Sequence, residues 1–355
     1  MRATFTPEQR EIGETVASLA AGESARARDA LSGPWLAPAC DGPLLRDFGL
    51  LGVPEAAGGV GSSLIDLLVA VEALGERLVP SRFPAHAAAV QLLCGDDGSD
   101  PLPEEVLAGG RVLTCAVDVP GAAGWADRVS PDPLVRTLVP YAAQADGIAV
   151  LGPGGVWTAE AARVDVRESA DASVPLSDVT LAAPGRVASA GAGVRRATLV
   201  AAAELCGVAQ GAIDLAAEQA RTRRQFGRVI GSFQGVAFQL AEAATARKAA
   251  WDLTLYAAWA VDTGRSDAEI QVHAAKAAAG RAAVFAAERC IQVHGGMGIT
   301  MEADPHLFLR RALVLDARFG RGSWHRRRVG ELRVAALRVG ARTGELRVRA
   351  RTAAA

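Results

Sequence analysis

The sequence has little lysine, few aromatic residues and no marked excess of charge of either sign. Lysine occurs only at Lys248 and Lys276 among 355 residues, aromatic residues make up 5%, and the formal net charge is −1. This balance argues against a protein that binds nucleic acid through bulk electrostatics. A hydrophobic share of 50% excludes a highly charged disordered chain. The length instead predicts roughly two or three domains with a substantial core.

Paired cysteines and long apolar segments are also missing. The five cysteines, at positions 40, 94, 115, 206 and 290, are scattered without a C-x-x-C pair, so we predict buried free thiols rather than zinc or dithiol redox chemistry. The dispersed histidines have no H-x-x-x-H spacing, and we predict no metal site. No charge-free apolar segment reaches the about 18 residues of a membrane span, and the polar N-terminus does not resemble a signal peptide. We therefore expect a cytoplasmic protein that binds neither a membrane nor nucleic acid.

Changes in composition and in hydrophobic periodicity divide the chain into three parts. Residues 1–112 have helical periodicity and begin with the capping sequence Thr6-Pro7-Glu8-Gln9. Residues 113–190 are richer in Pro, Gly and short Val-containing runs, with a hairpin signal at 152–155, and predict a small β domain. Residues 191–355 return to long Ala-rich segments with short breaks, which predict an antiparallel four-helix bundle. The expected fold class is α+β, mostly α. The segments expected to be helical in the bundle are 199–220, 234–261 and 267–293.

The strongest candidate binding motif is Arg223-Arg224-Gln225-Phe226-Gly227, followed by Phe233-Gln234. Guanidinium groups match phosphate oxygens with paired hydrogen bonds. Gln234 would add an uncharged donor and acceptor, and Phe226 offers a flat surface for a ring system. The alternative is that these arginines only complement the dipole at the end of a helix that Gly227 terminates.

A second candidate motif is Gln292-Val293-His294-Gly295-Gly296-Met297-Gly298. Glycine allows backbone amides to approach a ligand without a Cβ in the way. The alternative is a glycine-rich helix cap and turn. The pairs Gly152/Gly154 and Gly191/Gly193 lack the strand, third glycine and helix of a dinucleotide fingerprint. We therefore predict no Rossmann domain.

Three stretches resemble the acyl-CoA dehydrogenase family over nearly the whole chain. They are DFGLLGVPEAAGGVG with VEALGERLVP (47–61 and 71–80), RRQFGRVIGSFQGVAFQLAE (223–242) and CIQVHGGMGITMEADPHLFLRRA (290–312). The combination of R-x-Q-F-G…F-Q with Q-x-H-G-G-x-G on an α–β–α chain is highly specific. The ending H-L-F-L-R-R-A…F-G is similar to a short branch of the family in which some members form one half of a heteromeric enzyme.

The resemblance implies a flavin-dependent chemistry and a cofactor site. In this family a carboxylate removes the α-proton of an acyl-CoA while the β-hydrogen leaves as hydride to the flavin of FAD. The family site lies across a subunit interface, which implies a homo-oligomer or hetero-oligomer, and an electron-transfer flavoprotein is the implied acceptor. The residues implied in FAD binding are Arg223, Gln225, Phe226 and Gln234, with Gln292, Gly295 and Gly296 from a partner chain.

The sequence departs from the family at both positions where a catalytic glutamate occurs. The usual position, counted from Glu302, is Phe319, and the minority position at the start of the first bundle helix is Ala197. Neither side chain can accept a proton, so the catalytic residue is unknown. Asp316 and Glu204 are the nearest substitutes, and each is also explained as an ordinary surface or helix carboxylate.

Other family positions have also changed. The T-E-P-x-A-G-S-D segment that contacts flavin and substrate in the family is reduced to 117–122 here. A Trp-x-Thr stretch that packs on the flavin is replaced by 136–140. A substrate-side arginine of the first bundle helix becomes Thr198, with Arg195 and Arg196 close by. These changes favour a chain that does not form a complete flavin site alone.

The last residues are strongly basic. Residues 321–355 hold ten arginines against Glu331 and Glu345, a local excess of +8. This segment could contact CoA phosphates or an acidic partner surface, or could be a solvated amphipathic helix.

The family resemblance and the departures from it leave two classes of function open. The first is an FAD-dependent acyl-CoA dehydrogenase acting on an acyl-CoA or carrier-bound acyl thioester, as one subunit of a heteromer with a second acyl-CoA dehydrogenase subunit. The second is a catalytically silent structural or regulatory subunit. A flavoenzyme of specialised metabolism acting on a carrier-bound acyl group is a further alternative.

Overall fold

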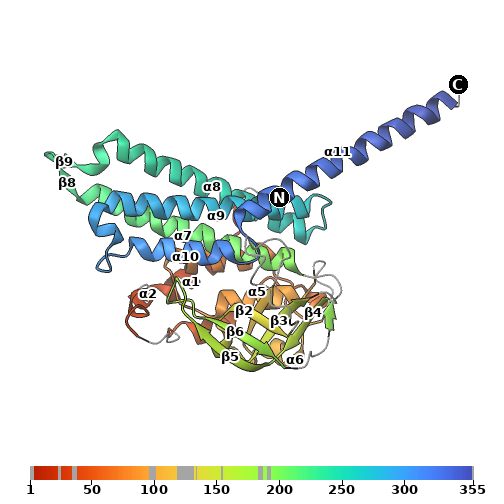
Figure 1. Cartoon of the computed structure of the whole chain (residues 1–355), viewed down its shortest axis with the longest axis horizontal. Helices are drawn as coiled ribbons and strands as arrows, with labels where there is room; N and C mark the ends of the chain where they lie inside the picture. Colours follow the sequence, from red (N-terminus) through yellow and green to blue (C-terminus); the bar gives the residue numbers. More distant parts are fainter. Residues whose placement is uncertain are drawn as a thin grey trace.

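The computed structural model describes residues 4–22, 25–33, 38–95, 101–117, 132, 134–152, 155–182, 187–189 and 193–353. A bundle of long helices lies along one side of the molecule, and small β-sheets with short helices lie on the other (Figure 1). The predicted α+β, mostly helical class is confirmed. The proposed domain boundaries at 112/113 and 190/191 fall between helical and β elements.

The N-terminal third is helical, and its first helix begins as the sequence predicts. Thr6 Oγ1 accepts from the Gln9 amide at 3.3 Å, and Gln9 Oε1 accepts from the Thr6 amide at 3.1 Å, which confirms the capping box. The helices are α1 (Pro7–Ala20), α2 (Ala25–Asp29), α3 (Asp41–Phe48), η1 (Glu55–Ala57), α4 (Leu64–Glu76), α5 (Phe83–Leu93) and α6 (Glu104–Leu107).

The middle of the chain forms two small sheets. One has the order β1-β3-β4-β7, with β1 and β3 parallel and the other pairs antiparallel, and the second has the antiparallel order β2-β6-β5. Gly152 pairs with Gly155, so the predicted hairpin at 152–155 is confirmed. The strands are β1 (Leu113–Val117), β2 (Val135–Pro140), β3 (Gly147–Gly152), β4 (Gly155–Ala159), β5 (Ala161–Arg167), β6 (Leu176–Leu181) and β7 (Val187–Ser189), with η3 at Ala142–Gln144.

The C-terminal half is the predicted antiparallel bundle. Its helices are α7 (Val194–Thr222), α8 (Gln234–Asp262), α9 (Ala268–His294), α10 (Pro305–Ala317) and α11 (Gly322–Ala353). A small hairpin, β8 (Arg224–Gln225) and β9 (Arg228–Val229), and η4 (Ile230–Ser232) join α7 to α8, and η5 (Gly295–Ile299) leads from α9 toward α10. Because the helices alternate in direction, the hairpin and η5 lie at the same end of the bundle, at the left of Figure 1.

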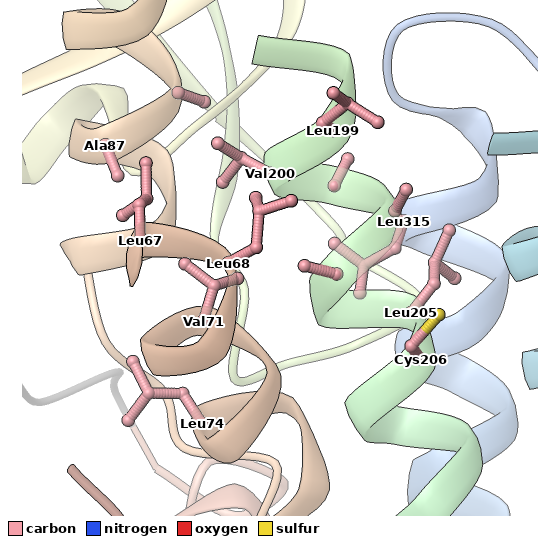
Figure 2. Close-up of a cluster of buried hydrophobic side chains, with 14 of the residues drawn as sticks. Leu67, Leu68, Val71, Leu74, Ala87, Leu199, Val200, Leu205, Cys206 and Leu315 are labelled. Atoms are coloured by element: carbon pink, nitrogen blue, oxygen red, sulfur yellow. The ribbon is translucent and has the colours of Figure 1, made fainter. Parts of the chain in front are cut away.

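Close packing of α4 on α7 joins the N-terminal helices to the bundle. Figure 2 shows leucine and valine side chains of α4 facing those of α7, with Leu315 of α10 beside them. Two glycines of α7 permit this approach, because a Cβ at Gly207 would lie 2.0 Å from Glu72 O and one at Gly211 would lie 2.0 Å from Glu76 O. Any larger residue at either position would push the two helices apart.

Buried cysteines and one long apolar helix complete the core. All five cysteines are free and buried, as predicted. Among the helices of the described residues, α7 alone has the length and apolar composition of a membrane span, and 83% of its most apolar window is buried inside the protein. A core helix of a folded domain has these properties too, and the burial favours that interpretation.

Candidate functional site

The loops at the hairpin end of the bundle contain every residue that the sequence nominates for cofactor binding. We call the segments 221–234 and 292–305 the hairpin end. Arg223 follows the last residue of α7, Gln234 is the first residue of α8, and Gln292 lies in the last turn of α9. Antiparallel topology brings these three helix ends to one end of the bundle (Figure 1).

A two-residue turn shapes the arginine motif. Phe226 and Gly227 both have positive φ, 52° and 80°, as required for the turn of a tight hairpin. The sequence analysis offered Gly227 as the residue that terminates the helix, and this is wrong. The helix α7 ends at Thr222, and Gly227 lies in the hairpin turn. The turn leaves Phe226 91% exposed, with its ring edge against Phe233. The guanidinium carbon of Arg228 lies 4.1 Å from the centre of the Phe233 ring.

The nominated side chains are exposed and face no described residue that would use up their hydrogen-bonding groups. Arg223, Gln225, Gln234 and Gln292 are all exposed. Gly295 and Gly296 are exposed too, and a Cβ at either would meet no atom within 4 Å. Exposed apolar side chains lie on the same segments and on α8: Phe238, Met297, Ile299 and Met301. A mixed surface of this kind is typical of a site completed by another chain.

The chemistry of this surface fits the phosphate end of a dinucleotide. Arg223 and Arg224 supply guanidinium donors for diphosphate oxygens, and the open backbone at Gly295 and Gly296 admits a ligand without a side chain in the way. Phe226 offers an exposed ring face for an aromatic group. The residues present therefore fit the adenine and diphosphate part of FAD.

The position that holds the catalytic glutamate in the family lies just after the C-terminal end of α10, and the residue there is buried. Phe319 lies in the short loop between α10 and α11, has a positive φ of 56° and is 5% exposed. The neighbouring Gly320 has φ 101°, and the Arg318 guanidinium carbon lies 5.6 Å from the centre of the Phe319 ring. Ala197, at the minority position, is fully buried in α7. Both positions are thus filled by apolar side chains packed into the core.

Three titratable side chains support this loop, and we call Lys276, His273 and His325 the loop clamp. Lys276 and His325 are buried and contact the loop, whereas His273 is half-buried and contacts His325. Lys276 Nζ donates to Asp316 O at 3.0 Å and to Gly320 O at 3.2 Å. His325 Nε2 lies 3.1 Å from Phe319 O, and because a carbonyl only accepts, this nitrogen carries the proton. His325 Nδ1 therefore accepts from His273 Nδ1 at 2.7 Å.

Burial shifts the titration of the loop clamp. Desolvation lowers the pKa of Lys276 to about 8, although Asp316 opposes the shift. Desolvation, together with the charges of Lys276 and His273, lowers the pKa of His325 to about 3. Burial also lowers the pKa of His273, although Glu269 opposes the shift. Both imidazoles are therefore neutral at pH 7, which agrees with the hydrogen-bond directions.

The first substitute carboxylate, Glu204, is already paired. Its Oε1 accepts from Arg311 Nη1 at 3.2 Å, and Arg311 also donates to Asp171 and, at 2.8 Å, to Ser173 Oγ. Although burial opposes it, the two carboxylates hold the pKa of Arg311 above its usual value. This buried network fixes α10 to α7 and to the turn before β6, which explains Glu204 as a structural residue.

The carboxylate of Asp316 is also engaged in contacts within the protein. Its Oδ1 accepts from the Gly322 amide at 3.3 Å and lies 3.8 Å from Lys276 Nζ. A Cβ at Gly280 would lie 2.0 Å from the same oxygen, so the carboxylate sits directly against α9. These contacts explain Asp316 as part of the connection between α10 and α11.

The arginine nearest the lost substrate-side position holds elements together. Arg196 is 2% exposed and donates to Gln91 Oε1 at 2.8 Å, Asp262 Oδ1 at 2.8 Å and Gly52 O at 2.7 Å. Thr198 Oγ1 donates to the Val194 carbonyl of its own helix. Arg196 therefore joins α7 to α5, to α8 and to the loop before α4, and is not available to a substrate.

The altered segments of the β region are described only in part. The segment 117–122, which replaces the family's flavin-contacting sequence, lies outside the described residues beyond Val117. In the replaced stretch 136–140, Arg136 is 6% exposed and Leu138 has a positive φ of 54° within an irregular β2–β6 pairing. Among the described residues, no group of three or more His, Cys, Asp or Glu side chains could hold a metal ion.

Sequence reasoning missed the loop clamp and the Arg311 network. Both depend on contacts between residues far apart in sequence, such as Arg311 with Asp171 and Lys276 with Gly320. One signal was available, since Lys276 is one of only two lysines in a chain that otherwise uses arginine. A lysine retained in an apolar helix is a candidate for a buried, paired cation.

Comparison with known sequences identifies relatives of the chain. The model of the acyl-CoA dehydrogenase C-terminal domain matches residues 186–332. The acyl-CoA dehydrogenase FadE34 of Mycobacterium tuberculosis is 33% identical over 304 residues, which cover 80% of this chain but 40% of FadE34. The acyl-CoA dehydrogenase IpdE2 of the same organism is 31% identical over 262 residues, covering 73% of this chain and 75% of IpdE2. The chain thus spans less than half of FadE34 but about three quarters of IpdE2.

Solved structures share the fold. The ChsE4–ChsE5 complex from Mycobacterium tuberculosis has a chain with TM-score 0.75 and 23% identity, covering 93% of this chain and 98% of that one. PigA with FAD and proline has TM-score 0.74 and 18% identity, covering 95% of this chain and all of that one (100%). From the matching motifs, the shared fold and the identity to IpdE2, the chain belongs to the acyl-CoA dehydrogenase family.

Proposed function

We propose that this chain is one subunit of a heteromeric FAD-dependent acyl-CoA dehydrogenase, whose partner subunit supplies the catalytic base. The observation that carries the proposal is the contrast between the two candidate regions. The residues expected to bind FAD are retained and exposed at the hairpin end, whereas Phe319 and Ala197 stand where the family has its base and are buried.

The proposed reaction is α,β-dehydrogenation of an acyl-CoA or carrier-bound acyl thioester. FAD, when bound, would supply the acceptor for the β-hydrogen as hydride. Arg223 would donate to the diphosphate, while Gln225, Gln234 and Gln292 would hold polar groups of the cofactor and Phe226 would cover a ring. The α-proton needs a carboxylate that neither Phe319 nor Ala197 provides, and the paired Glu204 and Asp316 are poor substitutes.

The proposed assembly follows from the exposure of the hairpin end. A surface with Phe226 91% and Phe238 65% exposed gains stability when a second chain covers it. Gln292, Gly295 and Gly296 of one chain would then meet a cofactor held mainly by Arg223 of the other. We propose that an electron-transfer flavoprotein accepts the electrons from the reduced flavin. We also propose a cytoplasmic location.

A catalytically silent structural or regulatory subunit is the second candidate. The observation that favours it is the closed Phe319 loop, whose three carbonyls at Asp316, Phe319 and Gly320 are held by the loop clamp. A subunit that retained the fold without catalysing the reaction would not need the Phe319 loop to admit a substrate. A flavoenzyme acting on a carrier-bound acyl group would have the same exposed hairpin end.

The test is to purify the chain alone and together with a homologue encoded nearby that contains Glu-Gly-Thr at the usual base position. Bound flavin is measured by absorbance, and turnover by bleaching of that absorbance on addition of acyl-CoA thioesters. We expect flavin and bleaching in the joint preparation and little bleaching by the chain alone. Full bleaching by the chain alone would refute the missing base, and a joint preparation with no flavin on this chain's site would favour the silent subunit.

A further inference from the structure

The last helix leaves the body of the protein. Its first turns pack on α9 through His325 and Trp324, but further along the helix extends away from the bundle (Figure 1). Every described side chain from Arg333 to Arg338 is exposed, including Val334 at 47% and Leu337 at 74%. We call residues 331–353 the arm. A helical segment whose described side chains from Arg333 to Arg338 are all exposed needs another surface to stabilise it.

The arm and the body have opposite charges. Residues 331–353 contain six arginines and two glutamates, an excess of +4, and because the whole chain carries −1, residues 1–330 carry −5. Arg333 and Arg338 are exposed, and no ion pair joins either to another described residue. The positive charges of Arg333 and Arg338 are thus available to an acidic surface outside their own helix.

An acidic face of matching length exists on the body. Glu8, Glu11 and Glu14 are exposed along one side of α1, and no ion pair links them to another described residue. The exposed Arg10 lies beside them and donates to Phe5 O at 2.9 Å. They span about 9 Å of helix, and Arg333 and Arg338 span about 7.5 Å, at about 1.5 Å per residue. The arm of the same chain runs away from the body, so an arm can reach such a face only on another molecule (Figure 1).

Other partners fit the arm less well. Two arms side by side would bring together like charges, an excess of +4 on each. Insertion at a lipid surface favours Trp, Phe and many Leu, but no aromatic residue follows Trp324 other than His325. Single-stranded nucleic acid favours aromatic side chains between the basic ones, and the charge of −5 on residues 1–330 would repel it.

We propose that the arm docks on the acidic face of α1 of a second copy of this chain. Arg333 and Arg338 contact carboxylates of Glu8, Glu11 and Glu14, while Val334 and Leu337 pack beside them. The contact is separate from the hairpin end and does not depend on FAD, so it stands or falls independently of the proposed function.

A disulfide trap tests the contact directly. The five native cysteines are all buried, so new surface cysteines can be paired selectively. Chains carrying Glu11→Cys and Arg338→Cys are mixed and oxidised, and we expect a cross-linked dimer of the two variants on a non-reducing gel. The control mixes Arg338→Cys with Arg163→Cys, an exposed position on β5 whose side chain is 72% exposed. Equal cross-linking in both mixtures, or none with Glu11→Cys, would overturn the proposal.

Charge exchange gives a second, independent measurement. Sedimentation of the full chain over a dilution series should show that R333E/R338E weakens self-association at least tenfold, while the control R46E/R163E, with the same charge change at exposed sites, does not. Adding E11R/E14R to the arm variant should restore association. Failure of the arm variant to weaken association would refute the contact. So would loss of binding to RNA or to anionic vesicles in that variant while self-association stays unchanged.

Discussion

The two ends of α10 lie in opposite surroundings. At its N-terminal end, the loop from α9 leaves Gln292, Gly295 and Gly296 exposed, and a Cβ at either glycine would meet nothing. At its C-terminal end, Phe319 is 5% exposed and the loop around it is bonded to buried side chains of α9 and α11. At the first end the side chain of Gln292 has no hydrogen-bond partner among the described residues, whereas at the second end the carbonyls of Asp316, Phe319 and Gly320 are already bonded.

The difference indicates how a family site can be divided between chains. An open end can gain a ligand and a second chain without disturbing its own core. A closed end can change its chemistry only by substitution of the residue that fills it, because its backbone is fixed by several buried hydrogen bonds. Three predictions test this contrast, two at the closed end and one at the open end.

The largest expected effect is a gain of activity from Phe319→Glu. If Phe319 occupies the position of the missing base, a carboxylate there should raise the rate of acyl-CoA-dependent flavin bleaching by the isolated chain about 10²–10⁴-fold. Stopped-flow absorbance with a panel of acyl-CoA thioesters measures that rate. Burial at 5% exposure should also raise the pKa of the new carboxyl, so bleaching should increase with pH.

The matched control is Phe319→Gln, which has nearly the same size as glutamate and no base. Thermal unfolding and flavin content show whether both variants fold and bind equally. Equal bleaching by the Glu and Gln variants, at equal flavin content, would mean that residue 319 does not face the reacting carbon. The heteromer hypothesis would then need a different explanation for the lost base.

The second effect concerns the loop clamp and acid. The folded pKa of His325 is about 3, against an ordinary value of 6.5. Below pH 6.5 the unfolded chain takes up a proton that the folded chain refuses until about pH 3, so the free energy of unfolding falls as the pH falls through this window. Between pH 6.5 and 4.5 this one group should account for about 2 kcal/mol.

Urea unfolding across that pH range measures the loss in the wild type, in His325→Asn and in His294→Asn. The His325 variant should lose less free energy of unfolding on acidification, because it removes the group that the unfolded chain protonates. His294 is a partly exposed imidazole at the hairpin end and serves as the control. A pH dependence in His325→Asn equal to that of the wild type would show that the clamp imidazole is not the group responsible.

The contrast between the two ends also separates what the sequence could predict from what it could not. Local signals gave the Thr6 cap, the 152–155 hairpin, the long bundle helices and the residues of the hairpin end, because each depends on neighbours in sequence. The sequence also showed that residue 319 lacks a carboxylate. It could not show that Lys276 and His325 hold that loop, or that Glu204 pairs with Arg311, because those contacts join residues that only the tertiary fold brings together.

The last prediction concerns the open end and tests whether its exposed arginine binds a cofactor. Arg223→Ala should weaken FAD retention by about 1.5–3 kcal/mol, or about 10- to 150-fold in Kd, if its guanidinium donates to the diphosphate. Flavin fluorescence during dilution or dialysis measures the change. Arg221→Ala is the matched control, since Arg221 lies in the last turn of the same helix but pairs with Glu218 at 2.9 Å and is 68% exposed. Because neither arginine is buried in the chain itself, both variants should unfold at nearly the wild-type temperature. Equal flavin retention by the Arg223→Ala and Arg221→Ala variants would mean that Arg223 does not bind the cofactor. The exposed arginine motif would then have to be explained by contacts with another protein chain.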